Sequence, residues 1–166
     1  MDTIGAEAKL EEKRRILLVD DDRAILASFR DLLLPRGYDV DTAETGREAI
    51  NKSNTKFYNL AVIDIKLPDM EGTELLANLH KNYPKTKKIM ITGYPTLETA
   101  VNSVNLRADA YLVKPVPPEE FLRMVDQQIH EQSSEESVTE EKVLDWVEGR
   151  YRKVKDKARP AQVVRS

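Results

Sequence analysis

The chain of 166 residues has room for one ordinary domain with extensions, and its formal net charge of −3 argues against a broadly basic protein made for nucleic acid. Because it contains no cysteine, disulfides, thiolate metal sites and thiol catalysis are excluded. No stretch approaches the roughly 18 consecutive apolar residues of a membrane span, and residues 1–13 lack the apolar run of a signal peptide. We therefore expect a cytoplasmic protein without a membrane partner, with residues 1–13 as an N-terminal extension.

The residues after this extension alternate between strand-like and helix-like segments. Short runs rich in Val, Ile and Leu without alternation are typical of strands covered on both faces, and helix-length segments between them supply the crossovers that parallel strands need. We expect such strands near residues 14–19, 60–63, 89–91 and 111–113, with an alternating edge strand at 38–42. The pattern predicts an α/β fold with a doubly wound, five-stranded parallel sheet.

Apolar residues at helical spacing predict five helices, at residues 25–33, 48–50, 75–79, 97–104 and 121–129. Pro35 and Gly37 are expected to end the first helix, because neither residue continues a helix readily. In the fourth helix, we expect Leu97, Val101 and Val104 to form the buried stripe.

The C-terminal part of the chain differs in composition. Residues 131–137 contain three serines and three glutamates, and we expect them to form a polar linker. A last amphipathic helix is expected next, with Trp146 at the edge of a stripe made by Val143, Leu144, Val147, Tyr151 and Val154. From Arg150 onward seven basic residues face one acidic residue, so this end is a solvated basic tail, a partner-docking or homodimer helix, or a nucleic-acid contact.

Each main strand ends on a residue that can take part in chemistry. Asp20 and Asp21 follow the first strand, Asp64 the third, Thr92 the fourth and Lys114 the fifth. The carboxyl ends of parallel strands meet at one edge of the sheet, so these side chains should share a pocket. Clustered carboxylates need a positive partner and are the hard oxygen ligands that Mg²⁺ prefers, whereas the absence of nearby His or Cys argues against Zn²⁺ or Fe. A carboxylate-bound metal beside a hydroxyl and a lysine is suited to phosphoryl transfer.

These residues resemble the receiver domain of two-component response regulators, over residues 14–132. The resemblance is carried by Tyr111, by the pair Lys114 and Pro115, and by three motifs that read ILLVDDD, AVIDIKLPDMEG and IMITGY. It implies a flavodoxin-like sheet with strand order 2-1-3-4-5. The expected domains are then an extension at 1–13, a receiver at 14–132, and a polar linker, amphipathic helix and basic tail at 133–166.

The resemblance also implies roles for the site residues. Asp64 would be the phospho-acceptor, taking a phosphoryl group from a phosphohistidine of a sensor histidine kinase. Asp20, Asp21, Asp64 and the backbone carbonyl of Lys66 would bind Mg²⁺.

Four further roles follow from the resemblance. Thr92 and Lys114 would contact the phosphoryl group, and the peptide bond to Pro115 would be cis. Thr92 and Tyr111 would form the switch pair that remodels the face around the fourth helix and fifth strand.

The expected function is therefore a phosphorylation-dependent signalling switch, a stand-alone response regulator that alters protein binding and is not an enzyme acting on a substrate. One alternative is a phosphatase of the haloacid dehalogenase class, since Asp20 and Asp22 form its Asp-x-Asp motif. That class needs a further acidic pair on a strand after the lysine, and it leaves Asp64 without a role. The other alternative is an interaction module that works without phosphorylation.

Overall fold

The computed structural model describes the backbone of residues 13–157 and the side chains of residues 13–152. The expected N-terminal extension lies almost entirely outside the described residues, as does the end of the basic tail. In chain order the elements are β1 (Arg15–Val19), α1 (Arg23–Leu33), the short 3₁₀ helix η1 (Leu34–Arg36), β2 (Asp39–Ala43), α2 (Gly46–Thr55), β3 (Leu60–Asp64), α3 (Gly72–Asn82), β4 (Lys87–Thr92), α4 (Leu97–Asn105), β5 (Ala110–Val113) and α5 (Pro118–Lys157).

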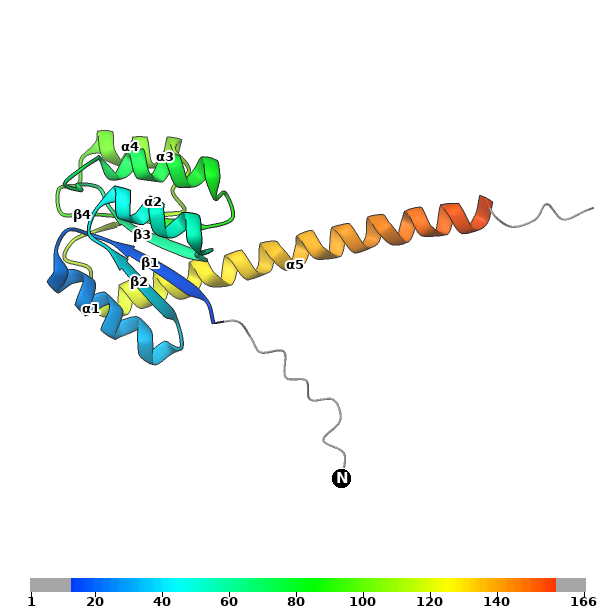
Figure 1. Ribbon diagram of the computed structural model, residues 1–166, viewed down its shortest axis with the longest axis horizontal. Coiled ribbons are helices and arrows are strands. Elements are labelled where there is room, and N and C mark those ends of the chain that lie inside the picture. Colours follow the sequence, from blue (N-terminus) through cyan, green and yellow to red (C-terminus); the bar gives the residue numbers. More distant parts are fainter. Residues whose placement is uncertain (1–12, 158–166) are drawn as a thin grey trace, which may run out of the picture. The chain divides into compact units, whose positions relative to one another are not determined.

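The five strands form one parallel sheet in the order β2-β1-β3-β4-β5, which confirms the predicted fold (Figure 1). The register pairs Val19 with Ile63, and Asp64 with Ile91. Thr92, the last residue of β4, pairs with Val113 at the end of β5. The carboxyl ends of all the central strands therefore lie along one edge of the sheet.

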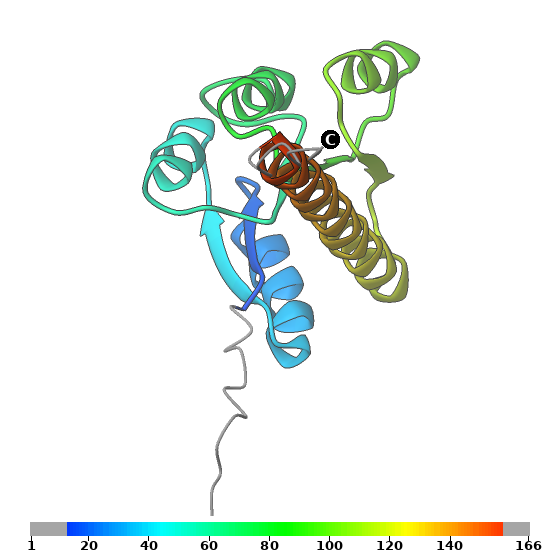
Figure 2. The same cartoon turned by 90° about the vertical axis from the view of Figure 1, so that its right-hand side faces the viewer.

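Two apolar layers cover the sheet, and successive strand residues alternate between them, as the pleat requires. Ile16 and Leu18 pack with α1 and with the first part of α5, up to Ile129. Leu17 and Val19 pack with α2 and α3 on the other face. Figure 2 shows these two helices on the side of the sheet opposite α1. Because both faces are covered, β1, β3 and β4 read as continuous apolar runs instead of alternating ones.

The ends of α1 follow from local chemistry. The side chain of Asp22 accepts hydrogen bonds from the backbone N–H groups of Ala24 and Ile25, so Asp22 is the N-cap of this helix. At the other end Pro35 lies in η1, and Gly37 adopts φ of 86°, a conformation that glycine takes without strain. The predicted stop of the first helix is confirmed.

The prediction of a buried stripe on α4 is wrong. Leu97 is 82% exposed, Val101 47% and Val104 70%, whereas the fully buried residue of this helix is Ser103. The Ser103 hydroxyl donates to the Thr99 carbonyl within the helix, which satisfies its hydrogen-bonding need in the core. Periodicity identified residues on one face of α4, but this face is turned away from the sheet.

The prediction of a linker at residues 131–137 is also wrong about conformation, because α5 continues through this segment. Glutamate and glutamine favour helix, and no glycine or proline interrupts the sequence between Pro118 and Gly149. The expected amphipathic helix is thus the C-terminal part of α5. Among residues 13–157, no helix is long and apolar enough to span a membrane.

Candidate functional site

Three carboxylates meet at the edge of the sheet. Asp20 and Asp21 follow β1, and Asp64 ends the neighbouring strand β3. Each offers an oxygen, and these oxygens lie within 4.8 Å of one another. Asp20 and Asp64 are buried, whereas Asp21 is exposed, so the cluster is open to solvent on one side. An all-carboxylate donor set that remains open to water and to a phosphate group fits Mg²⁺.

Lys114 supplies the positive charge of this site. It follows β5, and its Nζ lies 2.8 Å from Oδ2 of Asp20 and 3.4 Å from Oδ2 of Asp64. Burial acts to lower the pKa of Lys114, but the hydrogen bond to Asp20 and the charge of Asp64 outweigh it and raise that pKa above its ordinary value. The ammonium therefore stays charged and offsets the repulsion between the two carboxylates.

Asp64 differs from an ordinary surface aspartate. Burial and the charge of Asp20 raise the pKa of Asp64, against the opposing effects of Lys114 and the backbone N–H of Lys66. The ionised form of Asp64 is therefore short of stabilising partners. A cation bound to the cluster would supply such a partner.

Thr92 lies at the same edge, and among the described residues its hydroxyl makes no hydrogen bond to the carboxylates. Its buried hydroxyl accepts a hydrogen bond of 3.0 Å from the backbone N–H of Tyr94. The hydroxyl of Tyr111 lies 3.1 Å from Oγ1 of Thr99 on α4. Within the described part of the chain, Thr92 and Tyr111 are therefore held by separate hydrogen bonds.

The last two expected features concern backbone. The Lys114–Pro115 peptide bond is cis, as the resemblance implied. The backbone of Lys66 pairs with Glu71 in an isolated antiparallel bridge, so the loop after β3 closes on itself beside Asp64. The ammonium of Lys66 lies over the Tyr94 ring, 5.4 Å from its centre.

Two residues that support the site were given no role in it from the sequence. A Cβ atom on Gly72 would lie 2.2 Å from the carbonyl oxygen of Asp64, so only glycine lets α3 begin this close to the end of β3. The carboxylate of Asp69 accepts hydrogen bonds from the N–H groups of Gly46 and Arg47 at the start of α2. The glycine in the motif DMEG was the available signal for the first, whereas nothing local to Asp69 indicates the second.

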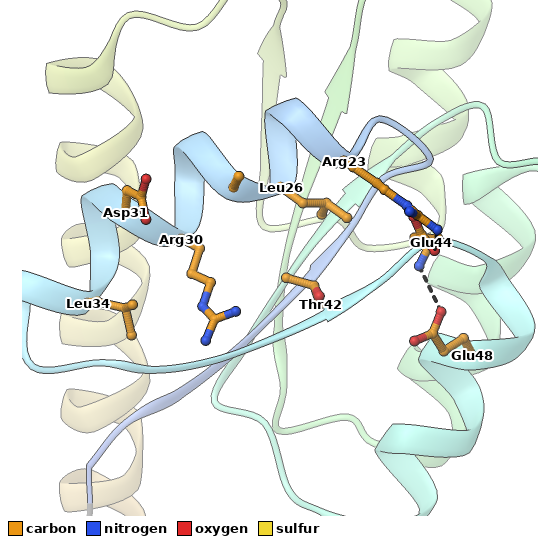
Figure 3. A pocket seen from close by; sticks show the side chains of 9 residues that line it. Arg23, Leu26, Arg30, Asp31, Leu34, Thr42, Glu44 and Glu48 are labelled. Carbon is orange, nitrogen blue, oxygen red and sulfur yellow. Dashed lines mark hydrogen bonds and ion pairs between the residues drawn. The ribbon is translucent and has the colours of Figure 1, made fainter.

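Two hollows of the described chain differ in their volume and in the residues that line them. The cavity that Asp20 and Asp64 help to line is only about 10 Å³, too small for an organic ligand. A hollow of about 600 Å³ lies between α1 and β2, lined among others by Arg30 and Glu48, and includes none of the clustered aspartates (Figure 3). Neither hollow therefore gives the clustered aspartates room for an organic ligand.

Comparisons with known proteins agree with this geometry. Residues 16–126 match the family described as the response regulator receiver domain. The alginate biosynthesis transcriptional regulatory protein AlgB of Pseudomonas syringae is 32% identical over 150 residues, which are 90% of this chain and 32% of AlgB. The acid tolerance regulatory protein ActR of Rhizobium meliloti is 37% identical over 109 residues, 66% of this chain and 56% of ActR. The chain thus spans about a third of AlgB.

Solved structures give the same result. A CheY-like response regulator receiver domain from Methanospirillum hungatei has 51% identity and a TM-score of 0.73, over 75% of this chain and 99% of that one. The beryllofluoride-activated NtrC4 receiver domain has 35% identity and a TM-score of 0.68, over 71% of this chain and 98% of that one. The chain belongs to the response regulator receiver domain family of two-component signalling.

Proposed function

We propose that this protein is a phosphorylation-dependent switch in which Asp64 accepts a phosphoryl group from a phosphohistidine of a sensor histidine kinase. The observation that carries the proposal is the cluster of Asp20, Asp21 and Asp64 with the Lys114 ammonium in contact with two of them. A carboxylate oxygen of Asp64 attacks phosphorus while the N–P bond breaks. The electron pair of that bond stays on the imidazole, which takes up a proton, and Asp64 becomes an acyl phosphate.

The residues around Asp64 have separate tasks in this reaction. Asp20, Asp21, Asp64 and the carbonyl of Lys66 would hold Mg²⁺, which supplies positive charge for the phosphoryl oxygens. The Lys114 ammonium exchanges its contact with Asp64 for a contact with the phosphoryl group, and the Thr92 hydroxyl donates a hydrogen bond to it. The proton that the leaving imidazole takes up is needed on the kinase side of the reaction, so the residues around Asp64 act by positioning and charge neutralisation.

The output of the switch would come from the face formed by α4 and β5. Thr92 and Tyr111 each have one hydrogen bond that can be exchanged, to Tyr94 and Thr99 respectively. When the Thr92 hydroxyl turns to the phosphoryl group, Tyr111 is free to leave Thr99 and α4 to shift. Phosphorylation favours one of these two states only by its better contacts with that state.

The exposed apolar residues of α4 fit a protein partner for this output. Leu97, Val101 and Val104 are all exposed and follow one another at helical spacing, and grouped apolar residues of this kind mark protein interaction surfaces. We propose a receiver domain at residues 14–132, a sensor histidine kinase as phosphodonor, and a downstream protein as target. The name of AlgB refers to transcription, but this chain spans only 32% of AlgB, and the proposal includes no contact with nucleic acid.

The test is intact mass spectrometry after incubation with acetyl phosphate, with and without Mg²⁺. We expect one phosphoryl adduct that requires Mg²⁺, is absent in Asp64→Ala, and is retained in Asp31→Ala, which removes an exposed aspartate of α1. Catalytic turnover of a phosphate ester would instead support the haloacid dehalogenase alternative. Absence of any adduct would favour an interaction module that works without phosphorylation.

A further inference from the structure

The C-terminal part of α5, from residue 131 onward, carries an apolar stripe that is open to solvent. The stripe is defined here as Val143, Leu144, Val147 and Tyr151, which are 55%, 61%, 49% and 68% exposed. Leu144, Val147 and Tyr151 are spaced by three and then four residues, the spacing with which two helices pack along a seam. Trp146 lies outside the seam, with its ring 4.6 Å from the guanidinium of Arg150. An exposed seam of this kind is suited to pairing with another helix.

The charges on either side of the stripe have opposite signs. Residues 131–141 contain five glutamates and no basic residue. Residues 150–157 contain five basic residues and one aspartate. The stripe lies between an acidic half and a basic half of the same helix.

This charge distribution favours a second copy of the chain as the partner, with its helix antiparallel to the first. A second copy placed parallel would set acidic half against acidic half and basic half against basic half. A second copy placed antiparallel, with Leu144 of each copy facing Val147 of the other, sets residues 134–141 against residues 150–157 and so pairs opposite charges. We propose that the C-terminal part of α5 forms an antiparallel two-helix dimer with a second copy of this chain.

The proposal extends beyond the phosphorylation switch and does not depend on it. None of the stripe residues belongs to the carboxylate cluster, so the dimer forms in the unphosphorylated protein. Its attraction includes surface charges, so its affinity falls as salt is raised.

The first experiment measures the mass of the full chain in solution by sedimentation across a dilution series. We expect a dimer that dissociates on dilution and with salt, and that is lost in Leu144→Ser/Val147→Ser. Val138→Ser is the matched control, because Val138 is 49% exposed in the same segment but lies on a different face of the helix. Circular dichroism of each variant checks that the fold is kept. A monomer at every concentration, or a dimer that survives the double substitution, overturns the proposal.

The second experiment measures the direction of the helices, using spin labels on introduced cysteines, since the chain has none of its own. Ser134→Cys is chosen far from the centre of the stripe and Gly149→Cys near it, where an added side chain meets nothing within 4 Å. In an antiparallel pair residue 134 faces residue 157, so the two labels at 134 lie about 35 Å apart along the helices. The labels at 149 lie about 10 Å apart along the helices. Two short distances would mean a parallel pair and would overturn the proposal.

Discussion

Lys114 is the residue on which the charge balance of the site depends. Its ammonium contacts Asp20 and Asp64 together, and both carboxylates are largely buried. Without it, the ionised form of Asp64 would keep the unfavourable effects of burial and of the Asp20 charge and lose its main counter-charge. The effect of the lysine on the acceptor can therefore be read from the pH dependence of phosphorylation.

We predict that Lys114→Met raises the pKa of Asp64 further. Only the ionised carboxylate is a nucleophile, so the rate of phosphorylation falls as pH drops through this pKa, and the midpoint moves to higher pH in the variant. At neutral pH the rate should fall roughly 100-fold, the order of magnitude for losing one charge-stabilising group. Initial rates with acetyl phosphate across pH 4 to 8 provide the measurement. Lys81→Met, which changes an exposed lysine of α3, is the control; an unshifted midpoint in Lys114→Met would contradict the prediction.

Lys88 makes a second pH-dependent contribution, to stability. Its side chain is only 1% exposed, its Nζ donates to the carbonyl of Tyr83 at 3.1 Å, and burial lowers its pKa from 10.5 to about 8. Between these two values the unfolded chain binds more protons than the folded one, so this residue makes the free energy of unfolding rise with pH. Below pH 8 the cost of the buried charge is fully present.

We predict that Lys88→Met removes this pH dependence. From pH 7 to pH 10, the free energy of unfolding of the natural protein should rise by about 2 kcal/mol relative to the variant. Urea unfolding of both proteins at several pH values in this range gives the difference. If the free energy of unfolding depended on pH in the same way in both proteins, the pKa of Lys88 would not be lowered in the folded protein, and the prediction would be wrong.

The connection between β3 and α3 holds the acceptor residue in place. Gly72 begins α3, and its N–H donates to the carbonyl of Ile65, one residue after Asp64. An added Cβ would lie 2.2 Å from the Asp64 carbonyl oxygen and 2.8 Å from Cα of Ile65. Both neighbours are backbone atoms, so they cannot move aside as a flexible side chain could.

We predict that Gly72→Ala destabilises the protein by about 1–3 kcal/mol, because the loop must be displaced. The same displacement moves Asp64, so the rate of phosphorylation by acetyl phosphate should fall as well. Gly149→Ala is the matched control, since a Cβ there meets nothing within 4 Å and alanine favours helix. Thermal unfolding of the three proteins provides the test, and equal stability of Gly72→Ala and the natural protein would contradict it.

Sequence prediction succeeded where the general topology of a parallel sheet decides the outcome and failed where a particular packing contact decides it. The meeting of Asp20, Asp64 and Lys114 was predictable because the carboxyl ends of parallel strands must share an edge, whereas the strand order was implied by the resemblance to receiver domains. The outward direction of Leu97 was not, because periodicity identifies a helix face but not what covers it. The contact of Asp69 with the start of α2 was missed for a related reason, since it joins segments 22 or 23 residues apart.

Residues 131–137, at the boundary between the two parts of the chain, show that composition alone does not determine conformation. The polar composition predicts a linker, yet glutamate and glutamine continue a helix as readily as they remain irregular. Contacts divide the chain into Met1–His130 and Glu131–Ser166, so α5 begins in one unit and continues into the other. The position of the last buried apolar residue is a better guide to the end of the receiver than composition.

We predict that a protein ending at Gln132 keeps the receiver fold and the Mg²⁺-dependent phosphoryl adduct. Ile129 is 8% exposed and Val125 fully buried, so this truncation leaves both in the core. A protein ending at Met124 loses both side chains and should unfold at ordinary temperature, because each costs about 2–5 kcal/mol when removed.

Thermal unfolding at several protein concentrations distinguishes the roles of the two units. Only folded chains associate into the dimer, so the unfolding temperature of the full chain should rise with protein concentration. The protein ending at Gln132 lacks the stripe on α5, and its unfolding temperature should be independent of concentration. If both proteins show the same concentration dependence, self-association belongs to the receiver, and the C-terminal part of α5 has a different partner.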